Sequence, residues 1–254
     1  MKKVALALLI VFLFAVPAMA KTTIVFPTGG SYTQDMFKSL STELGLAISY
    51  VPLAPAEPLG GVLPGLDAGV EVTAVKIKKD DPFWKLAAQG SALPDYLPLP
   101  KLHIQVGLPV IPIDLGFIYS EVPNTDIKLM GGELKYAILK GGVVMPAVAI
   151  RGTYTKLSGI DVLDMETKSL DLSISKGFLF LTPYAGVGQV WITSTPKGVA
   201  AAALPTGAGL KKEDISQTKG FVGAKITFFP LMNLVAEADF AKVNAYSLRL
   251  NIHF

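Results

Sequence analysis

Apolar and polar residues alternate strictly at the end of the chain. The apolar positions, which share one face of an extended strand, are Tyr246, Leu248, Leu250, Ile252 and Phe254. The polar positions, which share the other face, are Ser247, Arg249, Asn251 and His253. Because successive side chains of a strand point to opposite sides, this pattern predicts a strand with one apolar and one polar face. The chain ends on that strand's aromatic residue, without a polar tail.

Similar segments precede this one throughout the chain. From Leu66 onward we identify ten, at 66–78, 100–109, 111–122, 127–139, 143–155, 166–176, 178–192, 219–229, 233–241 and 244–254. Most have about the 9–11 residues that a tilted membrane strand needs. The segment 178–192 is apolar on both faces, so its orientation stays open.

The connections between these segments alternate in length. Short ones lie at 109–112, 140–142, 176–177 and 230–233, and longer ones at 79–99, 156–165 and 193–218. All four short connections fall on one side of the sheet, as in barrels with short periplasmic turns and longer external loops. The pattern predicts an antiparallel up-and-down barrel of about ten strands. Two further strands, at 46–53 and within 193–218, would make twelve.

The first twenty residues have the features of a secretory signal peptide. Lys2 and Lys3 precede an apolar run from Val4 to Val16, and Ala18-Met19-Ala20 forms a small-residue cleavage site. We therefore expect residues 1–20 to be removed before Lys21, as in Sec-type export.

Residues 21–64 have a different pattern from the barrel segments and are expected to form an N-terminal lead. Ser31 or Thr33 is predicted to cap a short helix that runs through Leu44 and stops at Gly45. A short strand is expected at 47–53. We favour a lead packed on the barrel rim, and entry into the lumen as a plug is the alternative.

Composition supports a membrane barrel. The mean hydropathy is +0.48 and 51% of the residues are hydrophobic, yet after Ala20 no run approaches the roughly 18 apolar residues of a membrane helix. Backbone groups in lipid must be paired within the protein, which leaves a closed barrel over residues 65–254. A soluble barrel with an apolar interior is the alternative, but the charges on the polar faces argue against it.

Without Lys2 and Lys3 the net charge of the chain is 21 − 20 = +1, so no nucleic-acid partner is indicated.

The polar faces carry charges of both signs. The candidates for ion pairs inside the lumen are Glu71, Asp114, Glu133, Lys135, Arg151, Asp171, Lys225, Glu237, Asp239 and Arg249, accompanied by His103, Gln105 and Asn251. A barrel of about eight strands has an interior that side chains fill, whereas open porins need about sixteen. Ten strands therefore favour a closed, ion-paired lumen, and a narrow polar conduit is the alternative.

No catalytic or metal-binding motif is apparent, so we expect no enzyme activity, metal or cofactor. His103, one of only two histidines, has Asp80 and Asp81 in the loop before it, and we interpret it as a structural residue. Residues 81–90 are predicted to form a short external helix with Asp81 as its cap. Its Phe83 and Trp84 are candidates for binding a ligand at the mouth of the barrel, or alternatively cover an apolar rim.

With its signal peptide, alternating strands, alternating loop lengths and terminal aromatic residue, the chain resembles small bacterial outer-membrane β-barrel proteins of families without assigned activity. The resemblance implies a Gram-negative outer membrane, contact with its lipids and lipopolysaccharide, and recognition of the strand ending at Phe254 by the barrel-assembly machinery. It implies no site residues. Two functions stay open: a structural or surface-binding barrel, and a narrow channel or transporter gated by the N-terminal lead or by loop 193–218.

Overall fold

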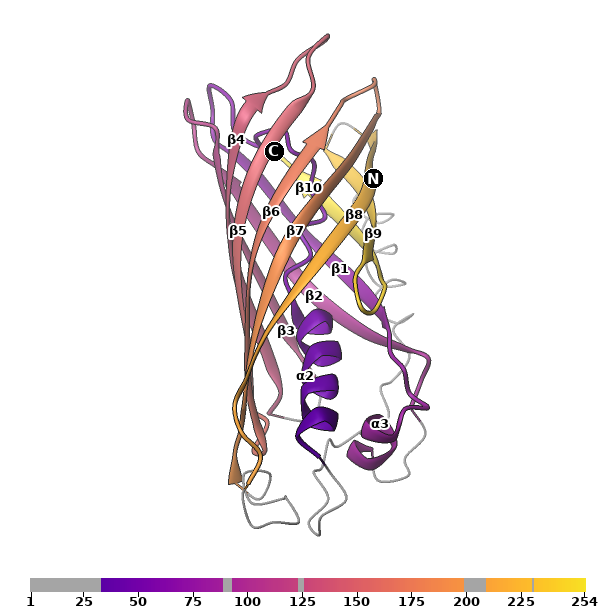
Figure 1. Cartoon of the computed structure of the whole chain (residues 1–254). Coiled ribbons are helices and arrows are strands. Elements are labelled where there is room, and N and C mark those ends of the chain that lie inside the picture. The colour runs from indigo at the N-terminus through magenta and orange to yellow at the C-terminus, as the bar shows by residue number, and fades with distance from the viewer. Residues whose placement is uncertain (1–32, 89–92, 123–125, 199–208, 230) are drawn as a thin grey trace.

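Ten antiparallel strands close into a single barrel in the computed structural model, which describes residues 33–88, 93–122, 126–198, 209–229 and 231–254 (Figure 1). The strands are β1 (Gly65–Lys76), β2 (Tyr96–Gly107), β3 (Ile113–Glu121), β4 (Lys128–Lys140), β5 (Ala147–Ser158), β6 (Leu163–Ser175), β7 (Leu181–Pro196), β8 (Glu213–Phe229), β9 (Met232–Phe240) and β10 (Ala245–His253). Each strand pairs with its neighbours in sequence, and β1 pairs with β10. The predicted up-and-down barrel is confirmed. The twelve-stranded alternative is wrong, because the barrel closes with ten strands and residues 49–53 form none.

The closing seam joins the two ends of the barrel sequence. Val70 pairs with Leu250 and Val72 with Leu248. At the end of the seam the backbone N–H of Phe254 donates to the carbonyl of Leu66 at 2.8 Å, and the N–H of Leu66 donates to the carbonyl of Phe254 at 3.0 Å. The last strand therefore satisfies the edge of the first, and the barrel has no free edge.

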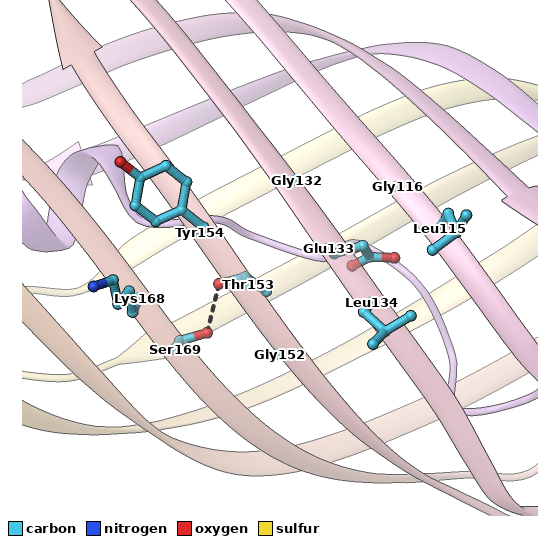
Figure 2. Close-up of a pocket in the computed structure, with 10 residues that line it drawn as sticks. All are labelled: Leu115, Gly116, Gly132, Glu133, Leu134, Gly152, Thr153, Tyr154, Lys168 and Ser169. Atoms are coloured by element: carbon cyan, nitrogen blue, oxygen red, sulfur yellow. Dashed lines mark hydrogen bonds between the residues drawn. The ribbon is translucent and has the colours of Figure 1, made fainter.

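The two faces predicted for β10 are inside and outside faces of the barrel. Ser247, Arg249 and Asn251 are buried, whereas Tyr246 and Ile252 are 46% and 40% exposed. The same alternation runs through the other strands, and Figure 2 shows the outward Leu115, Leu134 and Tyr154 on neighbouring strands. The wall is thus apolar on the outside and polar over much of the inside, the reverse of a soluble barrel.

Strand β7, which the sequence pattern does not orient, turns Tyr184, Val190 and Ile192 inward and Val187 and Trp191 outward. Val190 and Ile192 pack with α2 in one apolar cluster, and Tyr184 packs with Val51 and Leu53 of the N-terminal segment in another. Strand β8 begins at Glu213, six residues before its predicted start. The extension carries polar residues on both faces, so hydrophobic periodicity does not reveal it.

The short connections gather at the end of the barrel where the C-terminus lies, at the top of Figure 1. We call this the turn end, and the opposite end the loop end. The turns carry exposed apolar side chains, among them Val143 and Val144 between β4 and β5, and Leu179 between β6 and β7. Strand β5 starts at Ala147 rather than at residue 143, so these valines belong to the turn.

Helix α2 (Gln34–Ile48) lies inside the loop end of the barrel and contacts β5 to β8 (Figure 1). Thr33 is its N-cap, with Oγ1 accepting a hydrogen bond from the N–H of Met36 at 3.2 Å. The predicted stop at Gly45 is wrong, because the helix continues to Ile48. Glycine is needed there for close approach: a Cβ at Gly45 would lie 2.4 Å from Cγ2 of Ile192.

A large apolar cluster closes the loop end. It joins Phe37, Leu40 and Leu44 of α2 to residues from the ends of seven strands and from the short helix α3 (Pro82–Ala87). Asp81 precedes α3 as predicted, although its side chain makes no capping hydrogen bond, and Gly90 lies outside the described residues. In the same connection Lys79 Nζ lies 2.9 Å from Asp95 Oδ1, and this hydrogen bond raises the pKa of Lys79.

Within the part of the chain that the structure describes, neither helix is long and apolar enough to cross a membrane.

Candidate functional site: the charged lumen

Nearly all of the predicted luminal residues lie inside the barrel. Those that are at most 7% exposed are Glu71, Asp114, Glu133, Lys135, Arg151, Asp171, Glu237, Asp239 and Arg249. Lys225 differs: it is half-buried and lines a cavity near the turn end. These charges come from eight different strands, which the closed fold brings around one lumen.

The first group of charges spans β1 and β2, where Glu71 and Lys101 are register partners. Lys101 Nζ donates to Glu71 Oε1 at 2.8 Å and to Thr73 Oγ1 at 3.0 Å. Nδ1 of His103 lies 2.8 Å from the other oxygen of Glu71. The single carboxylate therefore holds both side chains of β2.

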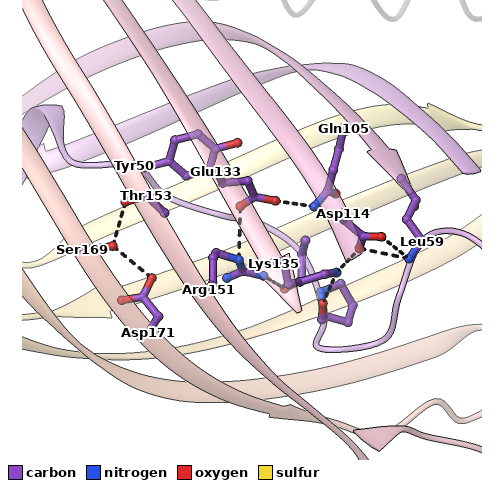
Figure 3. Close-up of polar contacts among 12 residues, drawn as sticks. Tyr50, Leu59, Gln105, Asp114, Glu133, Lys135, Arg151, Thr153, Ser169 and Asp171 are labelled. Carbon is purple, nitrogen blue, oxygen red and sulfur yellow. Dashed lines mark hydrogen bonds and ion pairs between the residues drawn. The ribbon is translucent and has the colours of Figure 1, made fainter. Parts of the chain in front are cut away.

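The second group joins β3 and β4, where Asp114 and Lys135 are opposite in register (Figure 3). Lys135 Nζ lies 2.7 Å from Asp114 Oδ2 and also donates to the backbone carbonyls of Pro55 at 3.1 Å and Glu57 at 2.8 Å. Asp114 in turn accepts the N–H of Leu59, at 3.0 Å to each carboxylate oxygen. Both members of this ion pair therefore form hydrogen bonds with the backbone of the N-terminal segment.

The third group joins β4 and β5, next to the second (Figure 3). Arg151 Nε lies 3.1 Å from Glu133 Oε2, and Gln105 donates to the other oxygen of Glu133. Nη2 of Arg151 donates to the carbonyl of Ala54 at 3.3 Å. Both ionic side chains are fully buried, so their mutual pairing offsets part of the large cost of removing them from water.

The fourth group lies on the opposite wall. Lys219 Nζ is 3.6 Å from Asp171 Oδ2 and 4.0 Å from Asp239 Oδ1. The hydroxyl of Tyr184 donates to Glu237 Oε2 at 2.7 Å. Three carboxylates thus face a single lysine.

Arg249 of β10 connects the first group to Asp67 of β1. Its Nη2 lies 3.5 Å from Asp67 Oδ1, its Nη1 lies 3.0 Å from His103 Nδ1, and Asn251 donates to Asp67. Asp67, Lys101 and Lys219 are luminal residues that the sequence analysis missed. Lys219 lies on the same strand face as Lys225, so the alternation along β8 was a signal that could have identified it as luminal. Lys101 follows prolines that obscure the alternation of β2.

The N-terminal segment occupies the centre of this site. Residues 50–56 are buried, and the chain runs from α2 at the loop end to the start of β1 at the turn end. Its side chains divide between two environments: Tyr50 Oη lies 3.1 Å from His103 Nε2, whereas Val51 and Leu53 pack against Tyr184, Phe221 and Val235. The N–H of Ala56 donates to Ser175 Oγ at 3.1 Å.

Phe83 and Trp84 do not form an exposed ligand site. They are only 8% and 3% exposed and belong to the apolar cluster that closes the loop end. Trp84 Nε1 donates to Glu43 Oε2 of α2 at 2.7 Å. The ligand hypothesis for these two residues is therefore corrected: they fasten α3 to α2. The periodicity of α3 does not reveal this contact, because the surface that the two side chains cover belongs to another helix, α2.

A polar cavity of about 240 Å³ lies beside the lead near the turn end. Its walls include Pro58 and Glu57 from the lead, and Lys225, Arg249 and His253 from the barrel.

His103 is separate from this cavity and has no exposed surface. Its partners are Glu71, Tyr50 and Arg249 rather than Asp80 or Asp81. In the described residues no cluster of His, Asp or Glu has the arrangement of a metal site.

No protein-family model matches the sequence, and a comparison with curated proteins finds no relative. Among solved structures, the N-terminal β-barrel domain of Pseudomonas aeruginosa OprF is similar at 16% identity, over 73% of this chain and 97% of that one, with a TM-score of 0.35. Ail, the attachment invasion locus protein of Yersinia pestis, is 12% identical over 75% and 97% of the two chains, with a TM-score of 0.30. The KdgM porin is 9% identical over 75% and 99%, with a TM-score of 0.35. The chain itself, through its closed strand pairing and apolar exterior, forms a β-barrel of the outer-membrane type.

Proposed function

We propose that this protein is an integral outer-membrane barrel with a closed lumen and a structural or surface-binding role. The observation that carries the proposal is the path of the N-terminal segment, which crosses the lumen and is held by charges of the wall. Within the predicted lead of residues 21–64, residues 33–64 are then the plug of a barrel formed by residues 65–254, and residues 21–32 lie outside the described residues. Residues 1–20 are the signal peptide that directs export.

The exterior supports a membrane location. On β5 the outward positions are apolar from Val148 to Tyr154 and become charged at Lys156. Together with the exposed valines of the preceding turn, this stretch approaches the roughly 9–11 residues of a tilted membrane strand. Lipid contact explains exposed apolar side chains that water would disfavour. We assign the turn end to the periplasm, where Phe254 is presented to the barrel-assembly machinery.

Closure follows from the energetics of the buried charges. Lys135 and Arg151 donate to three backbone carbonyls of the lead, and Asp114 accepts from its backbone. If the lead left the lumen, these groups would lose partners, and each unsatisfied buried polar group costs about 1–3 kcal/mol, more for charged groups. The wall and the lead therefore stabilise each other, which favours a static plug.

A narrow channel gated by the lead is the second candidate. It is favoured by the fourth group of charges, to which the lead donates no hydrogen bond among the described residues. There Lys219 Nζ, Glu237 Oε1 and Asp239 Oδ2 are buried without a hydrogen-bond partner among the described protein atoms. Buried polar groups of this kind are usually satisfied by water. A hydrated path beside the plug would suit small ions, and movement of the lead would widen it.

Conductance of the refolded mature protein in planar bilayers distinguishes the two candidates. The chain has no cysteine, and Ser41 Oγ of α2 lies 2.8 Å from Ser194 Oγ of β7. Cysteines at both positions are close enough for a disulfide, whose sulfur atoms lie about 2.05 Å apart, and oxidation would fix α2 to the wall. We expect silent bilayers for the wild type and for the double variant, oxidised or reduced. Stepwise currents that vanish on oxidation and return on reduction would instead establish the gated channel.

Heat-modifiable gel mobility tests the membrane barrel itself. A folded barrel in detergent should migrate differently before and after boiling. A mature protein that stays soluble without detergent and shows no such shift would overturn the proposal.

A further inference from the structure

The outer wall of the barrel has a groove across strands β3 to β6, with a volume of about 610 Å³. The outward side chains at its edges are Leu115, Leu134, Tyr154 and Lys168, and Gly132 and Gly152 form its floor (Figure 2). Glu133 also contributes atoms to the groove, but its carboxylate lies on the luminal side of the wall, where it pairs with Arg151.

The two floor glycines are not required by packing within the chain. A Cβ at Gly152 would meet no atom within 4 Å, and one at Gly132 would come no closer than 3.7 Å to an atom, the carbonyl oxygen of Gly116. In contrast, a Cβ at Gly186 or Gly223 would lie 2.3 Å from an aromatic ring. Glycine weakens a strand interior and often marks close approach by a ligand. The space above Gly132 and Gly152 is thus open to a molecule outside the chain.

The groove reaches the level where the outer face changes from apolar to charged. On β6 the outward positions pass from Leu170 to Lys168 and Glu166. Lys168 is paired in register with Tyr154 on one side and Trp191 on the other. Tyrosine and tryptophan are enriched at membrane–water interfaces, which sets Lys168 at the level of lipid headgroups.

The charge at this edge is mainly positive. The Lys168 side chain is 62% exposed, and Lys156 is exposed on the neighbouring strand, one outward position closer to the loop end. The carboxylate of Glu166 lies 3.8 Å from Lys168 Nζ, accepts a hydrogen bond from the Tyr154 hydroxyl at 2.8 Å and belongs to the register partner of Lys156. It offsets one of the two lysines, so the three side chains leave one positive charge at this edge. An apolar groove that ends at two lysines is complementary to an acyl chain carrying a phosphorylated headgroup.

We propose that this groove binds the lipid A part of lipopolysaccharide, with an acyl chain over Gly132 and Gly152 and a phosphate beside Lys168 and Lys156. The proposal rests on the membrane location and orientation given above, because the groove opens toward the loop end and hence toward the outer leaflet. In that leaflet the phosphorylated, acylated lipid is lipopolysaccharide, and this sets the occupant apart from phospholipids of the inner leaflet.

Native mass spectrometry of the refolded mature protein tests the site, with lipid A, dephosphorylated lipid A and phosphatidylglycerol added separately in detergent. Gly152→Leu fills the groove, and Gly220→Leu is its control, because Gly220 is an outward glycine of β8 whose Cβ would also be free of close contact. Lys168→Gln removes the phosphate partner, and Lys212→Gln is its control at a lysine with a similarly exposed side chain.

We expect Gly152→Leu to weaken lipid A binding roughly tenfold, the loss that corresponds to about two methylene groups no longer buried. Lys168→Gln should weaken binding of lipid A severalfold and leave binding of the dephosphorylated lipid unchanged, since only the former has the charge to lose. The two control variants should bind as the wild type does.

Equal binding by the wild type and Gly152→Leu, in samples that keep their heat-modifiable shift, would overturn the groove as the site without affecting the barrel. Phosphatidylglycerol bound as tightly as lipid A would overturn the choice of occupant. Loss of the heat-modifiable shift in the wild type would instead reject the proposed membrane barrel, so the two failures are distinguishable.

Discussion

The hydroxyl of Tyr50 lies 3.1 Å from Nε2 of His103, and this contact joins the N-terminal segment to the charged wall of the barrel. The rings meet edge to face, with centroids 5.7 Å apart. Because His103 is also bound to Glu71 on its other nitrogen, one tyrosine of the plug is connected to the seam where β1, β2 and β10 meet. The plug is therefore part of the polar network of the lumen rather than a filler of empty space.

Replacement of Tyr50 by phenylalanine should lower the free energy of unfolding by about 1–3 kcal/mol, because it leaves a buried nitrogen of His103 without its partner. Urea unfolding in detergent micelles measures the change. Tyr246→Phe, on the exposed outer face of β10, is the matched control and should have little effect. Equal stabilities for the two variants would show that the contact does not hold the plug.

Gly45→Ala separates helix propensity from packing. Alanine favours an exposed helix interior over glycine by about 1 kcal/mol, but here its Cβ would meet Ile192 at 2.4 Å. Overpacking of this kind costs about 1–3 kcal/mol, so we expect a net loss of stability. The additional change Ile192→Ala removes the obstructing atoms and should reduce the penalty of Gly45→Ala. A stabilised single variant would contradict the position of α2 in the barrel.

The pair formed by Glu133 and Arg151 should behave as a buried ion pair. Glu133→Gln or Arg151→Met alone leaves an uncompensated charge in the lumen, at a cost of about 3–5 kcal/mol. The double variant should lose less than the sum of the two. The ion pair between Asp164 of β6 and Lys197 after β7, whose side chains are 44% and 48% exposed, is the control. Removal of either partner there should change stability by less than about 1 kcal/mol. Additive losses at the buried pair would rule out coupling.

The direction of the lead predicts where the N-terminal end of the plug is exposed. Gln34 Nε2 donates to the carbonyl of Lys211, before β8, at 3.0 Å, so the helix begins at the loop end. With the turn end in the periplasm, a peptide tag inserted between Tyr32 and Thr33 should be labelled by antibody on intact cells. A tag in the turn at Gly142 should be labelled only after the outer membrane is permeabilised. The opposite labelling pattern would reverse the orientation.

The sequence by itself determined the barrel wall. Period-two alternation fixes which side chains of a strand share a face, and this reveals the strands, their polar side and the closure at Phe254 without knowledge of the third dimension. It located nine of the buried luminal charges for the same reason. Both faces are apolar on β7 and both are polar at the start of β8, so alternation is absent there. The pattern therefore predicts neither the orientation of β7 nor the start of β8.

Tertiary structure alone decided which charges pair and what fills the lumen. Ion-pair partners depend on strand register and on which strands become neighbours. The carboxylates that pair with Lys101 and Lys219 are therefore decided only when the barrel closes. The path of the N-terminal segment depends on surfaces far away in sequence: Gly45 is not a helix stop because Ile192 lies against it, and Trp84 is not an exposed ligand contact because Glu43 receives its hydrogen bond. Local sequence patterns do not predict such contacts, because the contacts form between residues that only the closed fold brings together.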